Sequence, residues 1–210
     1  MIVGFLSLTL LLGCCCMPSA EVKAAINNGV VEQEKSVNPL NYPKNTRERY
    51  VACLAQQYGI SYEAADQMEK KQSVATPLAA DEILKYKTID KVAGNFSDGN
   101  GYSVSPHISA EVSYVYSYEQ KKAISIQSVG GPILYIPGVS NCTFNKGTFN
   151  ITKPSSTSRR ISVTASAEYK VSGTTISVGG DIIGISQTVG GYTVSTKAKT
   201  FSITIYLSNL

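Results

Sequence analysis

A strict two-residue alternation of apolar and polar side chains constrains the fold of this chain more than any other feature. Every second residue from 161 to 171 is apolar: Ile161, Val163, Ala165, Ala167, Tyr169 and Val171. Segments 108–118 and 201–207 follow the same pattern. Because successive side chains of a strand point to opposite faces, the alternation predicts strands with one buried face, as in antiparallel sheets.

Short turn signals separate these segments, among them Gly130-Gly131-Pro132, Gly179-Gly180-Asp181 and Gly190-Gly191. No helical pattern lies between the expected strands, which argues against a parallel α/β sheet, because parallel strands need long crossover connections. We therefore predict a mainly β fold, an antiparallel β-sandwich of seven to nine strands that covers residues 84–210.

A helical pattern precedes the strands. Val51, Leu54, Ala55 and Tyr58 recur at the spacing of one helix face, and Gly59 is suited to end that helix. Thr46 and Ser61 are suited to cap the first and second helices. We predict a small helical hairpin over residues 46–83, which is too short to form its own core and should pack on the β domain.

The N-terminus predicts export. Residues 2–16 form an uncharged run of 15 residues, shorter than the roughly 20 that a membrane-spanning helix needs and typical of a signal peptide. We predict a signal peptide over 1–20 and a polar spacer over 21–45. Leu11-Leu12-Gly13-Cys14 also fits a bacterial lipobox, which makes Cys14 a candidate lipidation site. The expected location is secreted or extracellular, with a lipid anchor to the cell membrane as the alternative.

Export changes the meaning of the two cysteines that lie outside the predicted signal peptide, Cys53 and Cys142. A pair of cysteines in an oxidising compartment is a candidate disulfide, which here would tie the helical segment to the β region. Two separate buried thiols are the alternative, and the sequence does not choose between them.

Nucleic-acid and metal sites are not expected. A net charge of +4 is small for a general nucleic-acid binder, and the segment 62–69, which could follow a helix-turn-helix turn, carries three acids that would repel phosphates. The single histidine and the absence of a Cys/His cluster argue against zinc. The glycine-rich loop around Asp98 has too few carboxylates for calcium.

Catalytic residues are equally scarce, so we predict that the protein is not an enzyme and needs no cofactor. His107 is the sole histidine, and no Gly-x-Ser-x-Gly nucleophile motif accompanies it. Glu111 and Glu168 lie on the predicted polar faces of strands, where we expect them to be solvated, and nothing pairs them as a glycosidase would require.

The tyrosines of the expected strands allow two interpretations. They can form a platform for a sugar or peptide, since each ring is apolar and each hydroxyl can hydrogen-bond. They can instead belong to the core, which is the interpretation we favour because Ile108 and Val112 share their face. The set comprises Tyr114, Tyr116, Tyr118, Tyr135, Tyr169 and Tyr192.

The function that the sequence favours is an exported, non-catalytic binding or structural module at a bacterial cell envelope. Residues 84–210 contain 12 Lys and Arg against 6 Asp and Glu, so this region is mildly basic. Its expected partners are an anionic envelope polymer or another surface protein. The predicted ligand surface consists of Lys121, Lys122, Arg159 and Arg160.

A secreted membrane-active protein, of the β-pore-forming or bacteriocin-like type, is the alternative. Residues 174–198 are rich in Ser and Thr, carry few charges and contain a Gly190-Gly191 turn, as a membrane-inserting hairpin requires. Lys197 and Lys199 would lie on the same strand face as the apolar Phe201, so they would face lipid in an inserted hairpin. They therefore argue against membrane insertion.

Overall fold

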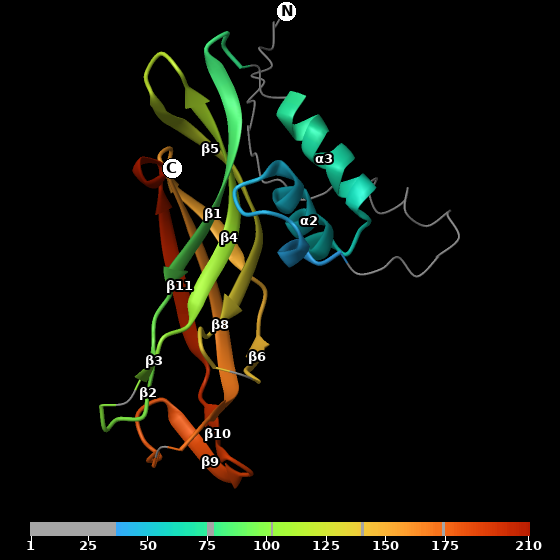
Figure 1. Ribbon diagram of the computed structural model, residues 1–210. Coiled ribbons are helices and arrows are strands. Elements are labelled where there is room, and N and C mark those ends of the chain that lie inside the picture. The colour runs from blue at the N-terminus through green and yellow to red at the C-terminus, as the bar shows by residue number, and fades with distance from the viewer. Residues whose placement is uncertain (1–36, 75–77, 102, 140, 174) are drawn as a thin grey trace, which may run out of the picture. The chain divides into compact units, whose positions relative to one another are not determined.

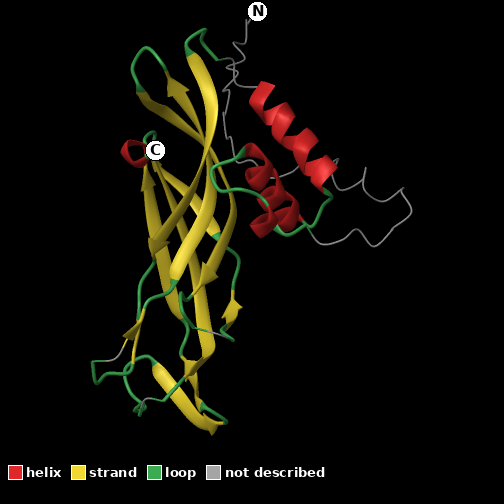
Figure 2. Ribbon diagram, in the orientation of Figure 1, coloured by secondary structure: helices red, strands yellow, loops and turns green. Residues whose placement is uncertain are grey.

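The computed structural model describes residues 37–74, 78–101, 103–139, 141–173 and 175–210. This part of the protein is mainly β, with two helices that precede antiparallel sheets (Figures 1 and 2). The predicted signal peptide, the candidate lipidation site Cys14 and spacer residues 21–36 lie outside the described residues. No described helix is long and apolar enough to cross a bilayer.

The two predicted helices are confirmed as α2 (Arg47–Tyr58) and α3 (Tyr62–Val74). Thr46 Oγ1 accepts a hydrogen bond from the Arg49 amide, and Gly59 ends α2 with a φ of +62°. The hairpin is shorter than predicted, because the chain is already in a strand at Glu82.

The predicted spacer also ends earlier than residue 45. Residues 39–41 form a 3-10 helix, η1 (Pro39–Asn41), in which Pro39 is buried. Asn45 and Thr88 exchange two hydrogen bonds, of 2.9 and 3.2 Å, which attach this segment to the first strand. The segment before α2 is therefore part of the packed structure.

The first sheet has three antiparallel strands in the order β1 (Glu82–Val92), β4 (His107–Ser117) and β5 (Lys122–Tyr135). Two very short strands, β2 (Phe96–Ser97) and β3 (Ser103–Val104), pair with each other in the segment that connects β1 to β4 along the chain. The strand predicted over 108–118 is confirmed by β4.

The second sheet is organised around β8 (Ser158–Val171), which contains the predicted alternation of 161–171. β6 (Thr143–Lys146) and β7 (Asn150–Ser155) pair with one edge of β8, and β10 (Gly191–Thr196) and β11 (Lys199–Tyr206) pair with the other. β9 (Ile182–Thr188) pairs with β10. The described residues thus hold eleven strands rather than seven to nine. Each edge of β8 pairs with two short strands instead of one long strand, and β2 and β3 are additional.

The main core is formed by apolar residues of both sheets, which fits the predicted alternation. Ile108 and Val112 of β4 share one buried cluster with Ile161 and Val163 of β8 and Phe201 of β11. The apolar residues of β8 and β11 and those in the first half of β4 therefore form the core, as the two-residue period requires. Tyr118, at the end of the predicted 108–118 alternation, is exposed instead.

The opposite face of β4 differs from the prediction. We expect Glu111 to be solvated from the sequence, but it is buried, as are Ser109 and Ser113 on the same face. The reason is the helical layer: α2 packs on β4 and β5 through a second, smaller core that includes Tyr50 and Leu54 (Figure 1). A polar strand face is thus covered by helix rather than solvent.

Candidate functional site

A groove of about 790 Å³ lies between the turn that joins β4 to β5 and the C-terminal end of β11. Both sheets contribute to it, and the 3-10 helix η2 (Leu207–Asn209) contributes as well. Its lining consists of Tyr116, Gln120, Lys121, Lys122, Ala123, Ile124, Thr157, Tyr206, Leu207, Ser208 and Leu210. Its size falls within the range of roughly 300–1,000 Å³ that is usual for small-molecule sites.

The lysine side of the groove is shaped by a hydrogen-bonded turn. Ser117 Oγ accepts a hydrogen bond from the Gln120 amide at 3.1 Å and donates one to Asp81 Oδ2 at 2.6 Å. Lys121 adopts a left-handed backbone conformation, with φ of +52°. The turn thereby leaves Lys121 and Lys122 exposed at the rim of the groove.

The opposite side is formed by the end of β11 and by η2. The Leu207 amide donates to the carbonyl of Thr157 at 2.8 Å, which ties η2 to the turn between β7 and β8. Lys87 Nζ donates to the carbonyl of Asn209 at 2.6 Å and thus ties η2 to the first sheet as well. These bonds hold the side chain of Leu207 against the groove.

A further positive charge lies next to the groove. Lys85 Nζ lies 3.8 Å from the centre of the Tyr116 ring, a cation–π distance. Tyr116 lines the groove, and Tyr206 on the other side is half exposed. The groove therefore combines two lysines, two tyrosines and aliphatic walls, which suits a ligand that carries negative charge.

The four residues predicted as a ligand surface do not lie together. Lys121 and Lys122 line the groove, whereas Arg159 donates to the carbonyl of Ile126 at 2.5 Å and bridges the two sheets. Burial lowers the pKa of Arg159. Arg160 points to the other face of β8, where it donates to Ser202 Oγ at 3.3 Å. The two arginines separate because neighbouring residues of a strand point to opposite faces.

The tyrosine set does not form one platform either. Tyr114 and Tyr169 are buried, Tyr118 is exposed, and Tyr116 lines the groove. Sequence reasoning missed Tyr206, whose aromatic ring stands on the otherwise polar side of the last strand. An aromatic residue on a polar strand face was the sequence signal for a ligand site. It could not identify the groove, because the residues of β4 and β5 that line it with Tyr206 are distant in sequence.

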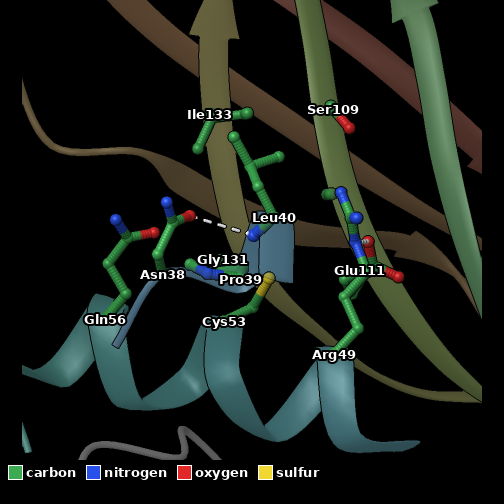
Figure 3. Close-up of a pocket in the computed structure, with 11 residues that line it drawn as sticks. Asn38, Pro39, Leu40, Arg49, Cys53, Gln56, Ser109, Glu111, Gly131 and Ile133 are labelled. Carbon is green, nitrogen blue, oxygen red and sulfur yellow. Dashed lines mark hydrogen bonds and ion pairs between the residues drawn. The ribbon is translucent and has the colours of Figure 1, made fainter. Parts of the chain in front are cut away.

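A second, small pocket of about 130 Å³ is lined by residues of η1, α2, β4 and β5 (Figure 3). Figure 3 shows Arg49 reaching from α2 toward Glu111, with Cys53 beside Gly131. Arg49 Nε lies 2.7 Å from Glu111 Oε1, and the Thr88 hydroxyl is 2.9 Å from both oxygens of Glu111. Because these polar groups are already bonded to one another, they hold α2 on the sheet and do not form the ligand site.

The candidate disulfide is absent from the structure, where Cys53 and Cys142 are free thiols. Cys53 is buried in α2 against Gly131 of β5, whereas Cys142 packs beside the main core. Burial raises the pKa of Cys53 to about 12 and that of Cys142 to about 11. The structure thus favours the alternative of two separate thiols.

His107 is engaged by its neighbours at the start of β4. Its Nδ1 atom lies 2.9 Å from Asp90 Oδ1, and the Tyr135 hydroxyl donates to the other oxygen of Asp90. Burial would raise the pKa of Asp90, but the hydrogen bonds from Tyr135 and His107 outweigh it and lower the pKa. The cluster is therefore an Asp-centred contact between β1, β4 and β5.

The loop around Asp98 is also internally bonded. Asp98 is buried, and its Oδ1 atom accepts a hydrogen bond from the Asn100 amide at 2.8 Å. Among the described residues, no group of three His, Cys, Asp or Glu side chains could hold a metal ion.

Comparison with protein-family models, with curated proteins and with solved structures found no match to this chain. The function proposed below therefore rests on the residues and geometry of the groove together with the character of the sequence.

Proposed function

We propose that this protein is an exported, non-catalytic binding module of a bacterial cell envelope. Its anionic ligand lies in the groove between the β4–β5 turn and the C-terminal end of β11, which we call the end groove. The observation that carries the proposal is the presence of Lys121 and Lys122 at the rim of a groove of about 790 Å³. The two lysines are exposed, so they can meet a negatively charged partner at little desolvation cost.

The architecture that we propose for this module is a β-sandwich with a helical layer on one outer face. Its support is the core cluster, in which Ile108 of the first sheet and Phe201 of the second both take part. The helices cover the other face of the first sheet. This arrangement leaves the end of the sandwich, where the groove lies, as the ligand site.

Export and anchoring are part of the same proposal. The uncharged run of residues 2–16 supports a signal peptide, and Cys14 is the candidate site of lipidation. The partner that we favour is an anionic envelope polymer, because such polymers are accessible to an exported or anchored module. Another surface protein with an acidic patch is the second kind of partner.

Retention on purified bacterial envelope tests the proposal. We expect the mature protein to bind at low salt and to be released as salt rises, because exposed charges are screened. The variant Lys121→Glu/Lys122→Glu should lose retention. The matched control Arg160→Glu/Lys170→Glu makes the same change in net charge at exposed positions of β8 and should keep it. Equal loss in both variants, or no retention of the wild type at low salt, would overturn the proposal.

A membrane-active protein is the second candidate, favoured by one observation on the β9–β10 hairpin. Val189 at its tip is fully exposed, and residues 182–196 carry no charged side chain. Lys197 donates to the Gly180 carbonyl and Lys199 to Asp181, so both lysines are bonded at the base of the hairpin. Dye release from liposomes by the mature protein supports this candidate, and absence of release and of membrane-bound oligomers rejects it.

A further inference from the structure

The groove offers more than positive charge, because most of its wall is apolar. Ile124 and Ala123 line it from β5, and Leu207 and Leu210 line it from the C-terminal side. None of the described residues that line it is Asp or Glu. A purely ionic ligand would contact the lysines and leave the half-buried side chains of Ile124, Leu207 and Leu210 partly in water.

We infer that the ligand of this groove is a single-chain amphiphilic anion, in which an alkyl chain ends in a phosphate or carboxylate group. The inference rests on the proposed function, since it takes the end groove as the ligand site. It adds the chemical class of the ligand, which the two lysines alone do not define.

The anionic head is assigned to the lysine rim. Lys121 and Lys122 are consecutive and exposed, and the turn that carries them is fixed by Ser117. Lys85, held on the ring of Tyr116, adds positive charge at the same end of the sheet. A phosphate or carboxylate placed at this rim gains Coulombic attraction without entering the interior.

The alkyl chain is assigned to the aliphatic wall between the sheets. Ile124 and Leu207 are half-buried and come from opposite sides of the groove. A chain that lies between them removes apolar surface from water on both sides. Each added methylene that is buried in this way should raise affinity about two- to fourfold.

The tyrosines complete the fit. Tyr116 and Tyr206 also line the groove, from β4 and from the end of β11. A phenol ring has an apolar face and a polar edge, so it suits the junction between a charged head and an apolar chain.

Calorimetric titration of the mature protein with alkyl phosphates below their micelle concentrations tests the inference. Inorganic phosphate, butyl phosphate, hexyl phosphate and octyl phosphate form the series. We expect affinity to rise with each step, and an octyl ammonium salt to bind at least tenfold more weakly than octyl phosphate. Lys121→Gln/Lys122→Gln should weaken binding at every chain length.

Leu207→Ser should flatten the dependence on chain length and leave the Leu207 backbone bond to Thr157 intact. Ile183→Ser, which changes an exposed aliphatic residue of β9, is the matched control and should preserve the dependence. Both variants should keep the thermal midpoint of the wild type within a few degrees, which shows that they fold.

Two outcomes would overturn the inference. Affinity that does not change with chain length would show that the wall takes no part, although lysine-dependent retention on envelope would still support the proposed function. Equal binding of octyl ammonium and octyl phosphate would show an apolar groove without selectivity for anions. If the protein is not retained on envelope but affinity still rises with chain length, the proposal of a polymer partner is wrong and the inference of an amphiphilic ligand stands.

Discussion

Arg49 Nε lies 2.7 Å from Glu111 Oε1 and joins helix α2 to the middle of strand β4. Glu111 is 2% exposed, and the Thr88 hydroxyl also bonds its carboxylate. Arg49 donates in addition to the Tyr42 carbonyl at 3.3 Å. The helical layer is thus attached to a polar strand face through an ion pair that is held away from water.

Removal of one partner of this pair should be costly. Arg49→Met leaves the Glu111 carboxylate buried without its counter-charge, so we expect a loss of about 3–5 kcal/mol in the free energy of unfolding. The double variant Arg49→Met/Glu111→Leu should recover most of that loss. Urea denaturation measures the three proteins. Arg160→Met, at an exposed position, is the control and should change stability by less than about 0.5 kcal/mol; an equal loss in Arg49→Met and Arg160→Met would contradict the role of the pair.

Close packing of α2 on β5 predicts a specific effect at Gly131. Its φ is +53°, and an added Cβ would lie 2.4 Å from Cys53 Cβ. Gly138 has a φ of +72° and nothing within 4 Å of its would-be Cβ, so it isolates the backbone strain. Gly138→Ala should cost about 1–2 kcal/mol, and Gly131→Ala should cost about 1–3 kcal/mol more. Thermal unfolding checks the difference, which should vanish if α2 does not pack on Gly131.

The hairpin should also be sensitive to acid. Burial would raise the pKa of Glu69, but hydrogen bonds from Ser73, Tyr86 and Arg47 outweigh it and hold the pKa below its ordinary value. The folded protein therefore binds this proton less readily than the unfolded chain does. The contribution is present above the unfolded pKa of about 4.3 and is lost as pH falls through the lower folded value.

Unfolding measured from pH 7 to pH 3 tests this linkage. Glu69→Gln should lower stability at pH 7 and reduce the further loss below about pH 4. Glu63→Gln changes an exposed position on the same helix and should follow the wild type. A Glu69→Gln profile parallel to the wild type down to pH 3 would refute the linkage.

The two cysteines should remain thiols in the folded protein. Raised pKa values of about 12 for Cys53 and about 11 for Cys142 keep both in the unreactive thiol form near pH 8. Iodoacetamide should label both after unfolding without reductant, and neither rapidly in the folded protein. Peptide mass spectrometry resolves the two sites; labelling that requires prior reduction would indicate the disulfide.

Local elements could be predicted because their signals lie within a few residues. The alternation from Ile161 to Val171 identified β8, and Thr46 and Gly59 identified the limits of α2. The interruptions of the flanking strands could not be predicted in the same way. They arise where the pairing with β8 shifts register, between Ser195 and Lys199 for example, and register depends on the partner strand.

The sequence by itself determined helices α2 and α3, strands β4, β8 and β11, and the faces of β8 and β11 that enter the main core, because backbone geometry and apolar periodicity act locally. The tertiary structure alone decided that Glu111 lies under a helix and that Lys121 and Tyr206 line the same groove. Both outcomes depend on contacts between residues that are far apart in the chain. A polar residue on the strand face opposite the core can be solvated by water or paired with a charged side chain. Which of the two occurs depends on whether another element packs on that face.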